Sequence, residues 1–265
     1  MRIARTSRID HPNPDSVVLA LAEARASVAA GAKKIPFKSK LWTCFRSDLI
    51  SLFSRTCAYC ENDLLGQRQP AIDHFRPKGD TRGEDGRAIT LNTETHRGYW
   101  WLAYTWGNLI PLCTRCNTYQ KKCVFPVARQ HHFTEIYDLA ALDQSEEPLL
   151  INPLYDDFED HFDVNVVTAQ LLPKTIRGET TIRIMGLNNS TSDDDILGAR
   201  RLAAQQALNA FREFQDAARN DCAPPAMAMQ IRDSIEVGSA PFAYTLRAVW
   251  NAAHERTADR LKAIT

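Results

Sequence analysis

Apolar side chains recur every three or four residues in several parts of the chain, which is the spacing of an amphipathic helix. This pattern predicts five helices, over residues 16–30, 40–54, 175–185, 196–214 and 244–262. Gly186 directly follows the third of them as its expected C-cap, because glycine adopts the left-handed conformation there without strain. The C-terminal third is thus expected to be helical, as a scaffold or docking surface.

Alternation of apolar and polar side chains predicts only a few short strands. One strand is expected to end at residues 72–75, and others are expected over residues 149–154 and 162–167. A short strand pair is expected within residues 87–95, after a polar loop at 79–86 that reads as flexible. Short strands among longer helices predict an α+β fold for the 265-residue chain.

Two C-x-x-C pairs, Cys57/Cys60 and Cys113/Cys116, supply four thiols. Four thiolates in two such pairs are the ligand set of a closed, structural Zn²⁺ site, which holds the fold and performs no chemistry. A redox pair or ordinary buried cysteines are the alternatives. The remaining cysteines have no matching partners and are expected to be free thiols, which fits a reducing cytoplasm: Cys44, Cys123 and Cys222.

An Asp-His pair, Asp73-His74, lies between the two cysteine pairs, and Asn117 directly follows the last cysteine. Carboxylate and amide oxygens are hard ligands that suit Mg²⁺ or Mn²⁺. A neutral histidine beside such an ion takes a proton from water, which then attacks a phosphodiester. The alternative is that His74 is a packed histidine at a strand end and that Asn117 caps a helix beginning there.

These residues, in this order, resemble the HNH endonucleases with a four-cysteine zinc staple, also called the ββα-metal family. The resemblance implies a zinc-stapled ββα-metal core set in a mostly helical chain. It also implies that Asp73 and Asn117 bind the catalytic Mg²⁺ or Mn²⁺ and that His74 is the general base. Asn108 corresponds to the asparagine that holds the loop positioning the base.

A narrower resemblance covers residues 57–61, 72–78 and 99–104, and extends less tightly over most of the chain. These segments look like the PtuB-like HNH proteins of Septu anti-phage systems, which are also found with some retrons. The resemblance implies an effector that hydrolyses nucleic acid, DNA being the expected substrate. It further implies an ABC/SMC-type ATPase partner, PtuA-like.

Charge is unevenly distributed although the whole chain is neutral. Residues 1–130 carry 20 Lys and Arg against 11 Asp and Glu, a net charge of +9, whereas residues 131–220 carry 7 against 16, a net charge of −9. A basic nuclease half suits a phosphate backbone; solvated surface charge is the alternative. The basic residues nearest the candidate site are the predicted phosphate contacts: Arg76, Lys78, Lys121 and Lys122.

The motifs divide the chain into three predicted regions: an N-terminal helical region at 1–55, a zinc-bearing nuclease core at 56–130, and a mostly helical region at 131–265. The aromatic run at 99–106 is expected to pack behind the nuclease motif. No apolar run approaches the ~18 residues of a membrane span, so no membrane association is expected. The other class of function compatible with these residues is a zinc-ribbon subunit that binds nucleic acid or protein without cutting.

Overall fold

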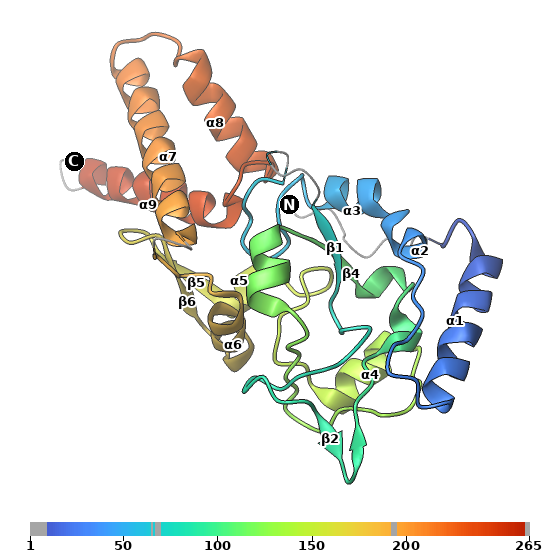
Figure 1. The fold of residues 1–265 in the computed structure, drawn as a ribbon. Coiled ribbons are helices and arrows are strands. Elements are labelled where there is room, and N and C mark those ends of the chain that lie inside the picture. The colour runs from blue at the N-terminus through green and yellow to red at the C-terminus, as the bar shows by residue number, and fades with distance from the viewer. Residues whose placement is uncertain (1–9, 65, 67–69, 192–194, 263–265) are drawn as a thin grey trace.

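The computed structural model describes residues 10–64, 66, 70–191 and 195–262 (Figure 1). Helices lie at both ends of this part of the chain, and its strands form three two-stranded sheets between them. In Figure 1, α7 and α8 lie side by side and project from the rest of the molecule. The helices at the two ends are α1 (Pro14–Ala29), α2 (Lys40–Thr43), α3 (Arg46–Leu52), α7 (Ile196–Arg219), α8 (Ala226–Val237) and α9 (Ala243–Lys262).

The centre of the fold is a ββα unit, as the sequence predicts for an α+β chain. Strand β1 (Ala71–His74) pairs antiparallel with β4 (Leu109–Leu112), with Asp73 opposite Ile110 and His74 opposite Leu109. The helix that follows, η3 (Arg115–Lys121), is a π-helix, in which the N–H of Lys122 donates to the carbonyl of Asn117 at 3.1 Å. A helix beginning at Asn117 was expected. It begins two residues earlier, since the Asn117 N–H already donates to Cys113 at 3.0 Å.

The aromatic run packs behind this unit, which confirms the prediction for it. Two short 3₁₀ helices, η1 (Trp100–Leu102) and η2 (Trp106–Asn108), shape the run and lead into β4. Tyr99 and Trp101 are buried in a cluster with Phe75 and Phe125. Large aromatic side chains provide apolar area that two four-residue strands lack.

Two local predictions are wrong. Residues 40–54 form α2 and α3 rather than one helix, because the Phe45 N–H donates to the Trp42 carbonyl three residues back and tightens the chain there. Residues 149–154 form no strand: the N–H of Ile151 donates to the Thr181 hydroxyl at 3.0 Å instead of to a neighbouring strand.

Of the remaining elements, one helix and one strand follow the prediction. Gly186 caps α6 in the left-handed conformation with φ +56°, as expected. The strand predicted at 162–167 ends at Asn165, whose side chain accepts the N–H groups of the turn that follows. These two elements are α6 (Ile176–Met185) and β5 (Phe162–Asn165), whereas the sequence pattern does not predict α4 (Leu139–Glu146), α5 (Phe158–His161) or β6 (Gln170–Pro173).

The largest apolar cluster joins the cysteine pairs to the C-terminal helices. It contains Cys57 and Ile110 of the ββα region together with Phe162, Phe211 and Trp250. The division at residue 130 stays a prediction, but the main core extends across it. Among the helices of the described residues, none has the length and apolarity needed to cross a bilayer.

The insert at residues 79–98 has an exposed tip and a buried base. Its tip is the hairpin of β2 (Thr90–Leu91) and β3 (Glu94–Thr95), which confirms the predicted strand pair. At the base, Nε2 of the buried His96 donates to the His132 carbonyl at 2.9 Å, while Nδ1 accepts the Gly98 N–H at 3.1 Å. Both ring nitrogens of the neutral imidazole are therefore used, and burial lowers the pKa of His96 from 6.5 to about 4.

This lowered pKa predicts a loss of stability in mild acid. Between pH 6.5 and 4 the unfolded chain binds a proton at His96 that the folded chain excludes, so the free energy of unfolding falls as the pH falls. The contribution of this one group is up to about 3 kcal/mol over that interval. His96→Gln should show a shallower pH dependence in urea unfolding, whereas the exposed His254→Gln should keep the wild-type slope. An unchanged slope in His96→Gln would contradict this assignment.

Candidate functional site

The four cysteines of the two C-x-x-C pairs meet in one buried cluster. Their sulfur atoms all lie within 4.8 Å of one another, and Cys60 Sγ is 3.7 Å from Cys113 Sγ. A tetrahedral ion with Zn–S bonds of ~2.3 Å places its sulfur ligands ~3.8 Å apart. All four thiols are free of disulfides, so the cluster fits the predicted zinc staple.

Backbone N–H groups point at these sulfurs. The Cys113 N–H donates to Cys57 Sγ and the Cys116 N–H to Cys113 Sγ, each at 3.4 Å. Such donors stabilise thiolates, and hydrogen bonds from the other thiols, that of Cys116 first, lower the pKa of Cys113. The first pair is also bonded to β4, because the Ala58 N–H donates to the Pro111 carbonyl at 3.0 Å. A zinc ion here would therefore hold both ends of the ββα unit together.

Loss of one of these sulfurs should remove the metal and the fold together. We expect wild-type protein to contain about one zinc per chain and Cys113→Ser to contain little, with a strongly lowered melting temperature. The matched control is Cys222→Ser, since Cys222 is exposed. Zinc analysis and circular dichroism make the comparison. Full zinc content in Cys113→Ser would exclude the four-sulfur site.

His74 ends β1 with its imidazole buried, at 2% exposure. Its Nε2 lies 2.8 Å from the Ala103 carbonyl, to which it donates, so Nδ1 is the nitrogen that accepts a proton. Burial, and then the charge of Lys78, lower the pKa of His74 to about 3. The ring of Trp42 stands edge-on to the imidazole with centroids 5.2 Å apart. His74 is thus neutral and held in one orientation, with Nδ1 as its acceptor nitrogen.

Asp73 presents one oxygen inward and the other outward. Its Oδ2 is buried and accepts no hydrogen bond, while the Nζ of Lys121 lies 3.0 Å away. The side chain as a whole is 16% exposed, which leaves Oδ1 as the outward oxygen. Asn117 is half-buried on the first turn of η3, beside the strand pair. Asp73 and Asn117 thus lie on neighbouring elements of the ββα unit, and carboxylate and amide oxygens are the ligand types that a hard divalent ion takes.

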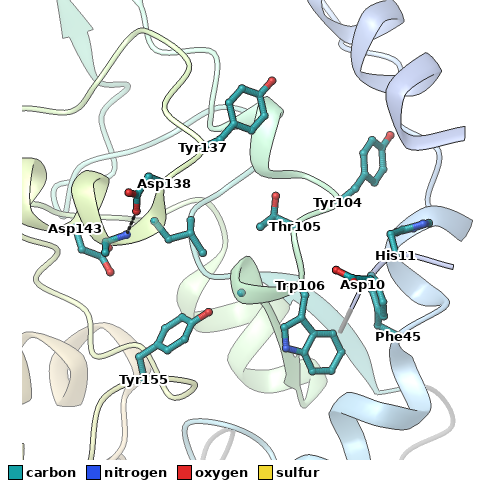
Figure 2. Close-up of a pocket in the computed structure, with 13 residues that line it drawn as sticks. Asp10, His11, Phe45, Tyr104, Thr105, Trp106, Tyr137, Asp138, Asp143 and Tyr155 are labelled. Atoms are coloured by element: carbon teal, nitrogen blue, oxygen red, sulfur yellow. Dashed lines mark hydrogen bonds between the residues drawn. The ribbon is translucent and has the colours of Figure 1, made fainter. Parts of the chain in front are cut away.

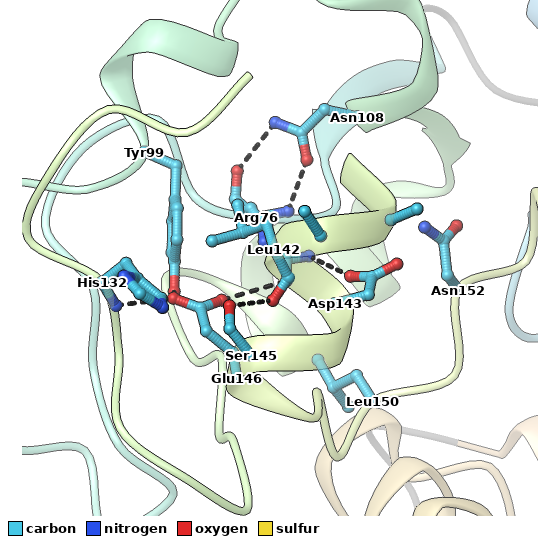
Figure 3. A network of polar contacts seen from close by, with 12 residues as sticks. Arg76, Tyr99, Asn108, His132, Leu142, Asp143, Ser145, Glu146, Leu150 and Asn152 are labelled. Carbon is cyan, nitrogen blue, oxygen red and sulfur yellow. Dashed lines mark hydrogen bonds and ion pairs between the residues drawn. The ribbon is translucent and has the colours of Figure 1, made fainter. Parts of the chain in front are cut away.

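Asn108 holds the chain on both sides of the base. Its Oδ1 accepts the Arg76 N–H at 2.8 Å, and its Nδ2 donates to the carbonyls of Arg76 at 3.1 Å and Leu102 at 3.3 Å. The Leu102 carbonyl directly precedes Ala103, the residue that binds the His74 ring. This arrangement is the one expected of a structural asparagine (Figure 3).

The structure places Arg76 away from solvent rather than at a phosphate. Its side chain is 1% exposed, and its guanidinium forms ion pairs with Glu146 at 3.0 Å and Asp143 at 2.8 Å, both on α4 (Figure 3). Glu146 is itself fully buried and accepts the Tyr99 hydroxyl at 2.8 Å. Arg76 is therefore a structural cation in this fold, and its prediction as a nucleic-acid contact is not retained.

The other predicted basic contacts divide into two kinds. Lys121 is fully buried and turned toward Asp73, so it too is not available as a surface contact. Lys78 is half-buried, with Nζ 5.0 Å from the Trp42 ring centroid, and burial lowers its pKa. Lys122 is exposed. Only Lys78 and Lys122 of this set reach the surface.

Removal of the buried guanidinium should destabilise the protein far more than removal of an exposed one. Arg76→Met leaves Glu146 charged and unpaired in the core, which costs about 3–5 kcal/mol. The matched control is Arg129→Met, because Arg129 pairs with Glu147 at the surface and such pairs contribute less than about 1 kcal/mol. Urea unfolding of zinc-loaded proteins measures both. Equal losses of unfolding free energy in the two variants would show that the buried ion pairs of Arg76 contribute little to stability.

A cavity of about 780 Å³ lies to one side of these residues, between the N-terminal region and α4 (Figure 2). Thr105 and Trp106 line its floor, and the Tyr155 hydroxyl closes over Gly107, where a Cβ would lie only 2.2 Å from that oxygen. Neither Asp73 nor His74 lines it. The sequence held no signal for this cavity, since its walls come from segments far apart in the chain.

Comparison with known proteins gives one consistent likeness. The chain is 30% identical over 158 residues to the Septu protein PtuB of Bacillus mycoides, and 25% identical over 173 residues to the Septu protein PtuB of Bacillus thuringiensis. The matched parts are 58% and 65% of this chain, but only 50% and 51% of those proteins. The chain thus spans about half the length of the curated relatives it matches.

No protein-family model matches the chain, and no solved structure matches it. The likeness therefore rests on sequence identity to the two Bacillus proteins. With its four-cysteine cluster, the chain is similar to the Septu PtuB proteins over more than half of its own length.

Proposed function

We propose that the protein is a divalent-metal-dependent HNH endonuclease that hydrolyses phosphodiester bonds of nucleic acid. The observation that supports this most directly is the state of His74. Its Nε2–H donates to the Ala103 carbonyl, which leaves Nδ1 as the unprotonated nitrogen, and Asp73 is the preceding residue of β1. A neutral histidine held in one tautomer has the free ring nitrogen that a general base in metal-assisted hydrolysis requires.

In this proposal each residue has a separate task. Asp73 Oδ1 and the amide oxygen of Asn117 hold the ion, and Asn108 keeps the chain around the base in place. Nδ1 of His74 takes a proton from water as the water oxygen bonds to phosphorus and the bond to the leaving oxygen breaks; that oxygen is protonated from solvent. A bound Mg²⁺ or Mn²⁺ stabilises the negative charge that develops on the leaving group.

The substrate proposal, with DNA favoured, rests on charge. The N-terminal half has a net charge of +9, and Lys78 and Lys122 are the predicted phosphate contacts that reach its surface. Such side chains bind phosphates without reading sequence. Likeness to Septu PtuB proteins supports a role in anti-phage defence, and we propose an ATPase as the partner. The projecting helices α7 and α8 are our candidate for the surface that docks it.

The second candidate is a nucleic-acid-binding or protein-binding subunit that does not cut by itself. The observation that favours it is the closure of the base. His74 is 2% exposed, and Trp42 of α2 covers its ring. For water and phosphate to approach Nδ1, this cover has to move, and a partner that moves it would switch the site on. Removal of Mg²⁺ or Mn²⁺ distinguishes the two candidates. It should abolish cutting by a nuclease, whereas binding by a non-cutting subunit should persist.

A cleavage assay with matched histidine variants tests the proposal. We expect wild type to cut supercoiled plasmid or single-stranded DNA with Mg²⁺ or Mn²⁺, and His74→Ala to be slower by roughly a hundredfold or more. His254→Ala is the control, because His254 is exposed on α9. Each protein is checked for zinc and for a melting transition.

Equal rates in wild type and His74→Ala would contradict the proposed base. If neither cuts, the same assay is repeated with the proposed ATPase partner added. Cutting that then depends on His74 supports the partner-activated form of the nuclease. Binding without cutting under both conditions, unaffected by chelation of Mg²⁺, supports the second candidate.

A further inference from the structure

Lys121 is buried at the point where the two proposed catalytic residues meet. Its side chain has no exposed surface, and its Nζ donates to the His74 carbonyl at 2.7 Å while lying 3.0 Å from Asp73 Oδ2. The sequence places this lysine one residue before the exposed Lys122, and only the fold separates their roles.

The π-helical form of η3 accounts for this inward position. The five-residue hydrogen bond from the Lys122 N–H to the Asn117 carbonyl inserts an extra residue into the turn. Lys122 then leaves the helix with φ +49°, so Lys121 ends η3 facing the strands. π-helical turns are rare and occur mostly at functional sites. Asn117 and Lys121 thus begin and end the same turn, and both belong to the candidate site.

The charges around Asp73 give the site no surplus of negative charge. Asp73 is the only carboxylate among the proposed ligands, and the ammonium of Lys121 already balances it. The amine of Lys78 lies near the same residues, and His74 is neutral. A divalent cation entering this site alone meets a carboxylate that already has its counter-ion, which opposes binding.

We propose that Lys121 is the internal counter-ion of Asp73, so that the free protein binds divalent metal weakly and holds the ion tightly only together with a substrate phosphate. This inference rests on the proposed nuclease function. The phosphate supplies the negative charge that the residues lack, and the ion bridges it to Asp73 Oδ1. Lys121 remains on Oδ2, which orients the carboxylate. Metal and nucleic acid then bind cooperatively, and the empty site stays inactive.

The test measures Mn²⁺ binding to free, zinc-loaded protein by electron paramagnetic resonance, with no nucleic acid present. Lys121→Met removes the charge and should tighten Mn²⁺ binding roughly tenfold, as expected for removing one positive charge a few ångströms from a divalent ion. Lys121→Gln also removes the charge but keeps a donor for the His74 carbonyl, and should tighten binding likewise if the methionine variant does not fold.

Two reference variants distinguish a wrong metal site from a wrong role for Lys121. Lys174→Met is the matched control, since the exposed Lys174 also donates to a carbonyl, that of Glu159, and should leave Mn²⁺ affinity unchanged. Asp73→Asn should weaken binding. If Asp73→Asn has no effect, the proposed metal site is wrong. If Asp73→Asn weakens binding but both Lys121 variants bind Mn²⁺ no tighter than wild type, the nuclease proposal stands and the counter-ion inference is overturned.

Discussion

The fold depends on the convergence of four sulfur atoms from two distant parts of the chain. Strands β1 and β4 have four residues each, and a two-stranded sheet of that size is not stable by itself in water. The cysteine cluster joins the segment before β1 to the segment after β4, and the aromatic run packs against the same unit. A structural zinc there contributes its binding energy directly to folding. The geometry of Asp73, His74 and Asn117 follows from that closure.

Buried ion pairs are the second constraint. They fix the relative positions of elements more than they stabilise the fold. Arg76 pairs with Glu146, and Lys121 pairs with Asp73, all on different elements. Removing two charges from water costs as much as, or more than, their attraction returns, so such pairs are weak contributors to stability as a whole. A buried pair is favourable, however, only when its two charged groups are held in a well-defined geometry. The first pair ties α4 to the residue after Phe75, and the second ties η3 to the end of β1, so both fix the strand that bears the base.

Much of this could be predicted from the sequence where the signal is local. Cysteine spacing predicts the four-sulfur cluster that the structure contains, and apolar periodicity predicts the helices α6, α7 and α9. The burial of Arg76 could not be predicted, because its partner Glu146 lies far along the chain and nothing local marks it. Lys121 and Lys122 are identical neighbours, and only the π-helical turn directs one inward. The strand expected at 149–154 was wrong because a side chain of α6 took its hydrogen bond.

We propose that Asp73 and Asn117 form the metal site of a nuclease that needs a phosphate to hold its ion tightly. The most direct test is anomalous diffraction from crystals of zinc-loaded protein grown with Mn²⁺ and a DNA oligonucleotide whose phosphorothioate linkages resist cleavage. We expect a manganese peak bonded to Asp73 Oδ1 and to a phosphate oxygen, with Nδ1 of His74 facing the phosphorus. Bound DNA with manganese elsewhere, or with no manganese near Asp73, would contradict the account.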